Sequence, residues 1–481
     1  MGHDGGHDGA TLKRQFTLWS SFAFAFAFIS PIVALYGIYG LALSSAGPAF
    51  WWNFLLVFGG QMLVAMVFAE LVSRWPLEGS IYQWASRLLG RRAGWLAGWA
   101  YLWTLVIAMA TVALGAAGFL AQVVGINAPG NGLKLLIAFL VLAFGTAANI
   151  LGRGVLRALM SASIACEVVG SIGLGTWLLL FHRHHGLGVL FQGNGAVHGM
   201  SYLTGPFLLT MAFVGFSFVG FESAGAIAEE VQSPERNLPK AIIASLSFIA
   251  LVVTYTSLAI TLAVPDYRPV LDGKDADPVT STLTSQLGSG IARPLELLFV
   301  VGFFASFLAL QTSASRLLWS YAREGALPAS PWLRTLSRSQ HLPTNAILVT
   351  FAVGGVVFLA SVSEANIYTI LINFSAGGFY LAFLFPLAGN VVARVRGTWR
   401  PGAYDLHGWG TVVGVLALVW ATFGFFNIAW PRAAYDHWYL DWSFFLVAAV
   451  LGLLGLVLYG RSTTAAGGPS AVLAPDHEVA S

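Results

Sequence analysis

The stretch Phe28–Tyr36, FISPIVALY, places a serine and a proline in the middle of an apolar segment long enough to cross a bilayer. Proline lacks the N–H that a helix ladder needs, and its ring clashes with the preceding turn. A second segment holds Gly215, Gly220 and Glu222 within Phe213–Ser223, where glycine lowers the cost of unwinding. Either signal alone is also typical of a kinked helix. Backbone broken at membrane depth survives only where it lines a cavity or packs in protein.

Composition excludes an ordinary soluble protein. Of the 481 residues, 57% are hydrophobic and 9% are charged, whereas a soluble domain carries about 25% charged residues. The apolar residues come in repeated blocks of about 20, the length that crosses a bilayer. The sequence therefore predicts an all-α polytopic membrane protein with about twelve transmembrane helices. The apolar segments begin near Leu18, Phe50, Gly94, Leu135, Leu156, Gly205, Ala241, Leu295, Asn345, Ile367, Gly410 and Trp442.

Basic residues are distributed unevenly between the two sides of the membrane. With the amino terminus inside, the inner loops hold 18 of the 24 Lys and Arg residues. Cytoplasmic loops are enriched in these residues, so we expect both ends of the chain, 1–15 and 462–481, to be cytoplasmic tails. The segments 182–203 and 264–291 then form external loops. No basic run is longer than Arg91–Arg92, so nucleic acid is not an expected partner.

The two segments with break signals are five spans apart. Discontinuous helices at equivalent positions of two repeats indicate a transporter's binding site at the bilayer midplane. At such breaks, the amino termini of the half-helices attract anions, and exposed carbonyl groups hold cations. The pairing therefore strengthens the interpretation of both segments as broken helices around one site.

Four further stretches carry a resemblance to a known family: AGPAFWW from residue 46, FAELVSRWPLEGSIYQWASRL from residue 68, GFESAGAIAEEVQSPERNLPKAI from residue 220 and SASRLLWSYAREGALP from residue 313. Together with FISPIVALY they resemble the amino acid, polyamine and organocation (APC) transporter superfamily. The resemblance implies the LeuT-type fold, with two inverted five-helix repeats followed by two accessory helices. Its expected boundaries are a core at 16–400, with repeats at about 16–181 and 204–398, and accessory helices at 408–461.

The resemblance also implies where a substrate binds. The substrate carboxylate falls on the backbone of Ile32, Val33 and Ala34, and its ammonium group on Phe216, Ser217 and Val219. Phe216 or Phe218 is the candidate gate. Many relatives carry a glycine-serine-glycine run where this chain has Ile32, Val33 and Ala34, and this departure leaves ω-amino acids or amines open as substrates.

Two acids within the apolar segments are candidate functional groups, because intramembrane carboxylates are costly. Glu222 can pair with a substrate ammonium or carry a proton, and its alternative is a structural acid capped by backbone donors. Glu167 can bind a proton, or help to ligate a cation alongside Ser306 in the eighth span. In several sodium-independent relatives a lysine stands at the Glu167 position. The alternative for Glu167 is an interhelical hydrogen bond with no role in transport.

Charges at the inner end of the sixth span suggest a gate. Glu229 and Glu230 are expected within reach of Arg87, Arg91 or Arg92 on the first inner loop, which would form an ion-pair latch between repeats. The alternative is a solvated helix end, since surface ion pairs contribute little.

No signal for covalent chemistry accompanies these features. The sequence has no P-loop, HExxH, GxSxG or GxGxxG motif, so neither an enzyme nor an ATP-driven pump is expected, and no cofactor. His182, His184 and His185 are read as solvated loop residues rather than metal ligands. We expect a permease of the cell membrane that moves amino acids by alternating access, coupled to protons or another cation. The alternatives are a polyamine, choline or GABA-type amine carrier, an amino acid exchanger, a sensor that has lost transport, or a channel.

Overall fold

The computed structural model describes residues 16–126, 129–193, 199–337, 340–360, 367–432 and 437–462. The predicted tails, 1–15 and 462–481, lie outside these residues apart from Ser462. Within the described ranges every named element is a helix, and the one β contact is a parallel bridge between Phe16 and Val231. The predicted all-α class is confirmed.

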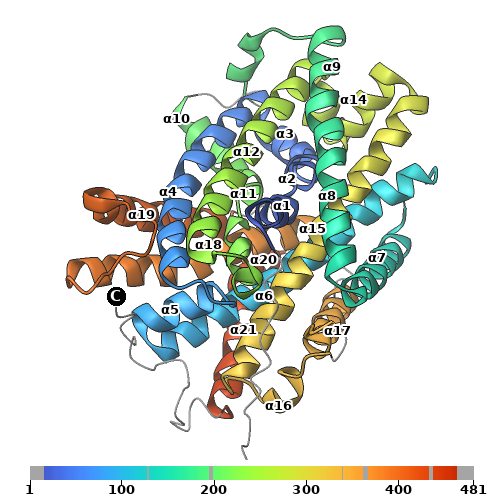
Figure 1. Ribbon diagram of the computed structural model, residues 1–481. Coiled ribbons are helices and arrows are strands. Elements are labelled where there is room, and N and C mark those ends of the chain that lie inside the picture. Colours follow the sequence, from blue (N-terminus) through green and yellow to red (C-terminus); the bar gives the residue numbers. More distant parts are fainter. Residues whose placement is uncertain are drawn as a thin grey trace, which may run out of the picture.

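The first half of the chain forms the following helices (Figure 1): α1 (Leu18–Ile29), α2 (Pro31–Tyr36), α3 (Tyr39–Ala46), η1 (Pro48–Trp51), α4 (Trp52–Arg74), α5 (Ile81–Leu89), α6 (Arg91–Val123), α7 (Asn131–Leu151), α8 (Arg153–Glu167), η2 (Val168–Gly173), α9 (Leu174–Phe181), η3 (Leu187–Phe191), α10 (Met200–Tyr202), η4 (Leu203–Phe207), α11 (Leu208–Phe216) and η5 (Phe221–Glu230).

The second half continues with α12 (Pro234–Ala263), α13 (Arg268–Leu271), α14 (Pro278–Leu287), α15 (Ser289–Arg323), α16 (Ser330–Leu333), α17 (Thr344–Ala360), α18 (Ile367–Val395), η6 (His407–Trp409), α19 (Gly410–Ala429), α20 (Trp438–Asp441) and α21 (Ser443–Gly460).

Eleven helical stretches within the described residues are long and apolar enough to cross a membrane. They coincide with eleven of the twelve predicted segments. The remaining one, predicted to begin near Asn345, corresponds to α17, which has 17 residues within the described chain and is apolar but shorter. The prediction of a polytopic membrane protein is confirmed, whereas the inverted repeats remain a prediction.

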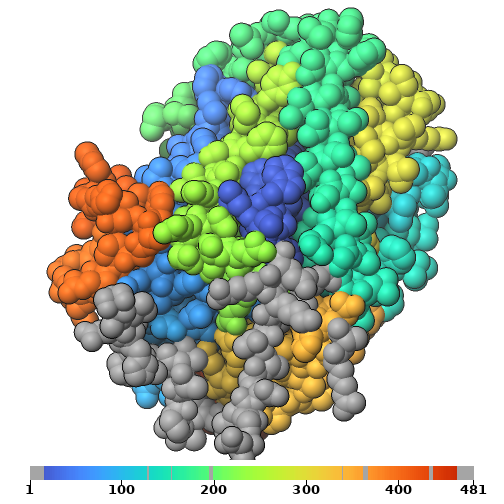
Figure 2. Space-filling model, in the orientation of Figure 1, coloured from blue at the N-terminus to red at the C-terminus, as the bar shows by residue number. Residues whose placement is uncertain are grey.

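The first span lies in the middle of the bundle (Figure 1), where α1 packs against α8, α12, α15 and η5. Its start, drawn in dark blue in Figure 2, reaches the surface between α12 and α8. The last helices differ, because α21 leaves most of its apolar residues exposed. Apolar side chains on the outside of a membrane protein can face lipid at no cost.

The first span breaks where the sequence predicts. Thr17 starts α1 with a capping box to Ser20, and the helix ends at Ser30, whose backbone takes a positive φ of 47°. Pro31 then opens α2 at its first position, where its missing N–H removes no helical hydrogen bond. The two half-helices are therefore built by the serine and proline that interrupt the apolar run.

The sixth span also breaks. After α11 ends at Phe216, the chain leaves the helix and Gly220 adopts a left-handed conformation with φ of 101°. The 3₁₀ helix η5 follows, with Ile227 departing from helical geometry inside it. A Cβ atom added to Gly220 would come within 2.2 Å of the Phe28 ring. Glycine is therefore required here for both its backbone conformation and the close approach of the first span.

Replacing Gly220 with alanine tests this requirement. We expect Gly220→Ala to lower the free energy of unfolding by about 2–5 kcal/mol, from backbone strain and overpacking against Phe28. Thermal unfolding of the detergent-solubilised protein, followed by size-exclusion chromatography, measures the effect. Gly59→Ala in α4 is the matched control, because nothing lies within 4 Å of its added Cβ. Equal stability of the two variants would contradict the account of the break.

Candidate functional site

The backbone N–H groups predicted to bind a substrate carboxylate all donate hydrogen bonds to other groups of the protein. Ile32 N–H donates to Glu167 Oε2 at 2.9 Å, and Val33 N–H donates to Ser30 Oγ at 3.3 Å. Ala34 N–H donates to the Ser30 carbonyl at 2.8 Å. The Ser30 hydroxyl in turn donates to Glu167 Oε1. The Glu167 carboxyl thus fills the position that an anionic group of a ligand would take.

Glu167 is held there by close packing of the fifth, first and eighth spans. It is fully buried at the carboxyl end of α8. A Cβ atom added to Gly302 of α15 would come within 3.1 Å of Glu167 Oε1, so the absence of a side chain at residue 302 makes room for the carboxyl group. Nearby on α15, the predicted residue Ser306 donates its hydroxyl to the Phe28 carbonyl at 2.7 Å.

The break in the sixth span has its own carboxylate. Glu222 is fully buried and accepts at 2.9 Å from the Gly220 N–H with Oε2 and at 2.9 Å from the Tyr101 hydroxyl with Oε1. These contacts match the structural role weighed for it, and they also place the acid at the break. The predicted residue Ser217 donates its hydroxyl to the Ala34 carbonyl, which ties the two breaks directly together.

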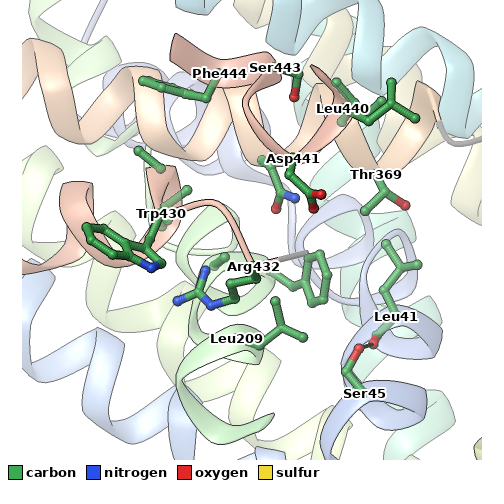
Figure 3. Close-up of a pocket in the computed structure, with 16 residues that line it drawn as sticks. Leu41, Ser45, Leu209, Thr369, Trp430, Arg432, Leu440, Asp441, Ser443 and Phe444 are labelled. Atoms are coloured by element: carbon green, nitrogen blue, oxygen red, sulfur yellow. Dashed lines mark hydrogen bonds between the residues drawn. The ribbon is translucent and has the colours of Figure 1, made fainter. Parts of the chain in front are cut away.

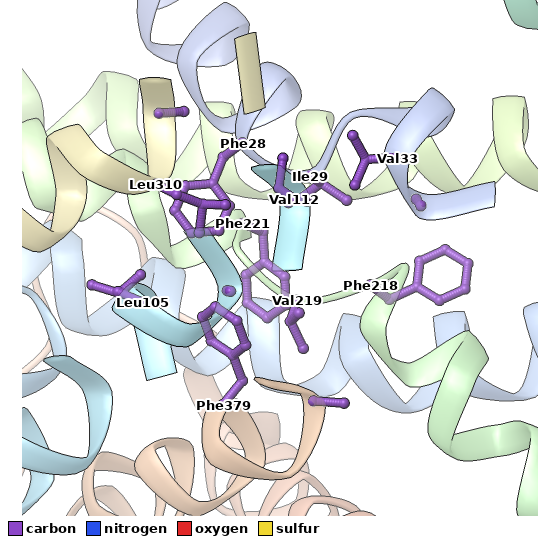
Figure 4. Packing of buried hydrophobic residues seen from close by; sticks show 14 of the residues in the cluster. Phe28, Ile29, Val33, Leu105, Val112, Phe218, Val219, Phe221, Leu310 and Phe379 are labelled. Carbon is purple, nitrogen blue, oxygen red and sulfur yellow. The ribbon is translucent and has the colours of Figure 1, made fainter. Parts of the chain in front are cut away.

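A small cavity lies between the breaks. It has a volume of about 10 Å³ and is lined by Phe28, Ile29, Val33, Ala108, Val112, Phe216, Val219, Ser306, Leu310 and Phe379. Figure 4 shows the apolar side chains of Phe28, Val33, Val219 and Phe379 converging there. A volume of that size holds about one water molecule, so the cavity has no room for an amino acid in this state. Of the predicted substrate residues, Val33, Phe216 and Val219 line it, whereas Phe218 packs against Phe54 and Phe58 of α4.

Among the larger cavities elsewhere, two have charged side chains in their lining. One, of about 350 Å³, is lined by residues that include Tyr36, Lys134, Asp277 and Tyr368, on the side predicted to be external. Val33 of α2 lines the central cavity and Tyr36, one turn later, lines this outer one. The Tyr36 ring packs against Phe299 with centroids 4.1 Å apart. This aromatic contact lies between the central cavity and the cavity on the predicted external side.

The other cavity, of about 210 Å³, lies between the core and the accessory helices (Figure 3). Its lining includes Leu41 of α3, Leu209 of α11, Arg432 and Asp441. It is larger than the central cavity, but no residue of 29–33 or 216–220 lines it, whereas Ile29, Val33, Phe216 and Val219, which border the two breaks, line the central cavity. The central cavity is therefore the better candidate for the transport site.

Ion pairs lie at the end of the sixth span that is predicted to be cytoplasmic. Glu229 pairs with Arg323, with two N–O distances of 2.8 Å. Glu230 pairs with Arg316 at 3.3 Å, and both side chains are buried. The sequence predicted a latch between these glutamates and Arg87, Arg91 or Arg92. The two arginines of α15 are partners that the sequence analysis did not predict. The Arg91 charge acts on the Tyr82 phenol of α5, where it lowers a pKa that burial raises.

The sequence did contain a signal for the α15 arginines. Arg316 and Arg323 are seven residues apart, so they lie on one face of a helix. Arg316 also follows a long apolar run, and a basic residue near hydrocarbon is costly unless paired. Tyr101, the partner of Glu222, carried no such signal, since an aromatic residue within an apolar segment is ordinary.

The described residues include no group of three or more His, Cys, Asp or Glu side chains placed to hold a metal ion. Of the loop histidines, His182 contacts Gln286 and His185 contacts the Val264 carbonyl. Both contacts join the segment 182–203 to the segment 264–291.

Comparison with known proteins agrees with this architecture. The profile of a family described as amino acid permease matches residues 16–455. The chain belongs to the amino acid permease family. The matched residues include both half-helix breaks and the ion pairs, and membership places the chain among amino acid transporters rather than enzymes.

The similar proteins include permeases from plants and bacteria. An amino-acid permease BAT1 homologue of Oryza sativa is 25% identical over 85% of this chain and 83% of its own length. The branched-chain amino acid permease BcaP of Lactococcus lactis is 27% identical over 87% of this chain and 88% of its own. A methylthioribose transporter of Bacillus subtilis is 28% identical over 60% of this chain and 62% of its own.

Exchanging the charges of one pair tests the gate. We expect Glu229→Arg or Arg323→Glu alone to reduce uptake of a transported amino acid at least about tenfold, because like charges then face each other in a partly desolvated site. The double variant, which restores the pair with reversed polarity, should recover a large part of the rate in proteoliposomes. If the double variant is no better than the single ones, the pair is not a latch.

Proposed function

We propose that the protein is a secondary active transporter that moves amino acids across the cytoplasmic membrane by alternating access, with uptake coupled to protons. The observation that carries this proposal is the small central cavity between two broken helices. In this proposal, the Tyr36–Phe299 packing closes it on one side and the ion pairs of Glu229 and Glu230 close it on the other. A site that must open to each side in turn needs separable seals of this kind.

The lining of the cavity supports a neutral substrate with an aliphatic side chain. Ile29, Val112, Leu310 and Phe379 present only apolar atoms to it, and burying a charged side chain against them would be costly. One relative is named a branched-chain amino acid permease, which agrees with an apolar substrate.

Glu167 supports proton coupling. A substrate carboxylate can reach the Ile32 amide only when Glu167 releases it, because one N–H serves one strong acceptor at a time. Protonation weakens the hold of Glu167, since a carboxylate is a stronger acceptor than a neutral acid. In this scheme a proton and an amino acid bind together, with Ser306 and the Phe28 carbonyl beside them.

Glu222 supports recognition of the ammonium group. Its carboxyl lies at the break in the sixth span, which follows the end of α11 at Phe216. The orientation proposed from the loop charges places the Glu229 and Glu230 pairs, and both termini, in the cytoplasm.

A second candidate is an amine carrier, with polyamines, choline or GABA as substrate classes. This candidate is favoured because the N–H groups of Ile32, Val33 and Ala34 already donate hydrogen bonds inside the protein. A substrate without an α-carboxylate needs none of them. One relative is named a methylthioribose transporter, so the wider family is not confined to α-amino acids.

Uptake into proteoliposomes tests the proposal. The panel is alanine, leucine, GABA, arginine, putrescine and choline, with and without an inwardly directed proton gradient. We expect saturable accumulation of leucine that depends on the gradient.

Glu222→Gln should lose at least about tenfold in uptake, because a buried charge-assisted contact contributes about 1.5–3 kcal/mol. Glu167→Gln should still exchange leucine but not accumulate it.

The control is Asp272→Asn, which removes an acid from an exposed external loop and should transport like the wild type. Competition by putrescine or choline alone would favour the amine carrier. Gradient-independent accumulation in wild type would contradict proton coupling.

A further inference from the structure

Glu78 lies beside the ion pairs of Glu229 and Glu230, in the connection between α4 and α5. Its side chain is fully buried. Its N–H donates to Glu229 Oε1 at 3.3 Å, and its carbonyl accepts from Ser320 Oγ of α15 at 3.0 Å. The backbone of Glu78 is therefore fixed between the end of the sixth span and the eighth span, where the ion pairs meet.

The carboxyl group of Glu78 has no such support. Neither of its oxygens has a hydrogen-bond partner within the described part of the chain. The two nearby guanidinium groups already pair elsewhere, Arg316 with Glu230 and Arg323 with Glu229. An ionised carboxylate without a partner costs several kcal/mol to bury, so the site favours the neutral acid.

Burial and the charged groups around Glu78 shift the pKa of its carboxyl. Burial raises the pKa of the Glu78 carboxyl well above its ordinary value, and the Glu230 and Glu229 charges raise it further, while Arg316 and Arg323 offset part of the rise. The next ionisable groups on α5 and α15 are Tyr82 and Glu324, which hydrogen-bond to each other. Among the charges that act on Glu78, Arg316 pairs with Glu230 and Arg323 pairs with Glu229, so Glu78 is the acid without an ion-pair partner.

We propose that Glu78 is a proton-binding site of the cytoplasmic gate, protonated when the gate is closed and ionised when it opens. This inference rests on the proposed alternating access. When the two ion pairs separate, water reaches Glu78 and the carboxyl gives its proton to the cytoplasm. The gate closes again only after Glu78 takes a proton back from the same side.

The direction in which pH shifts the gate follows from the raised pKa of Glu78. A group that is protonated more readily in the closed state stabilises that state at low pH, and this stabilisation is lost as the pH rises through the raised value. An acidic cytoplasm therefore keeps the gate closed, and an alkaline one favours opening. Because the proton is taken from and returned to one side, it sets the gate equilibrium without adding to the protons transported per substrate.

A cysteine beneath the gate can report its opening. Ser313 of α15 is fully buried, between Ser306 at the central cavity and Arg316 at the gate, so Ser313→Cys is reached by water only when the gate opens. The native Cys166 is first replaced with serine. Labelling by a water-soluble maleimide is measured in nanodiscs from about pH 6 to pH 8, and is divided by the rate at an exposed Gly408→Cys to remove the effect of thiol ionisation.

We expect the corrected rate to rise roughly tenfold or more over this range, since one proton shifts an equilibrium by up to about tenfold per pH unit. Glu78→Gln keeps the shape of the neutral acid and cannot ionise, so its rate should stay low and flat. Glu235→Gln, which removes an acid from the half-buried first turn of α12, should keep the wild-type profile. A flat wild-type profile, or an unchanged profile in Glu78→Gln, would overturn the proposal.

The labelling experiment is independent of the substrate. If the pH profile depends on Glu78 but no panel compound is taken up, the gate stands and the proposed substrate class fails. If leucine is transported but the pH profile of Ser313→Cys labelling is the same with and without Glu78→Gln, the proposed function stands and the proton site fails.

Discussion

Backbone groups freed by breaking a helix at membrane depth must find partners inside the protein, because hydrocarbon offers none. The rest of the structure depends on how this is done here. At the first break, Ser30 and Glu167 take the amides of Ile32 and Val33. At the sixth, Glu222 takes the amide of Gly220. Every one of these partners is polar or acidic, so satisfying the breaks also brings two carboxyl groups to the centre of the bundle.

The same constraint explains the ion pairs of the proposed gate. Burying Arg316 requires Glu230, and truncating one partner of a buried pair costs about 3–5 kcal/mol because the other charge is left behind. A site held by such pairs is either fully closed or fully open, since partial separation exposes charge to a poor solvent. Glu78 adds an acid without a cation to this arrangement, which makes the balance between the two states sensitive to protons.

Much of this could be predicted from particular residues. Segment length and apolar content predicted the spans, and Ser30, Pro31 and Gly220 marked both breaks, because local backbone chemistry decides where a helix ends. The contacts between spans could not be predicted. Glu167 reaches Ile32 only because Gly302 leaves room for it, and Tyr101 reaches Glu222 through packing that a sequence does not encode locally. The α17 span was predicted, and its described part is shorter than a full crossing.

We place the substrate between the two breaks. An experimental structure with a transported amino acid at saturating concentration tests this placement. We expect the ligand between Val33, Val219 and Phe379, with the cavity enlarged and Glu167 released from the Ile32 amide. A ligand bound instead in the cavity beside Arg432 and Asp441, with both breaks unchanged, would contradict it.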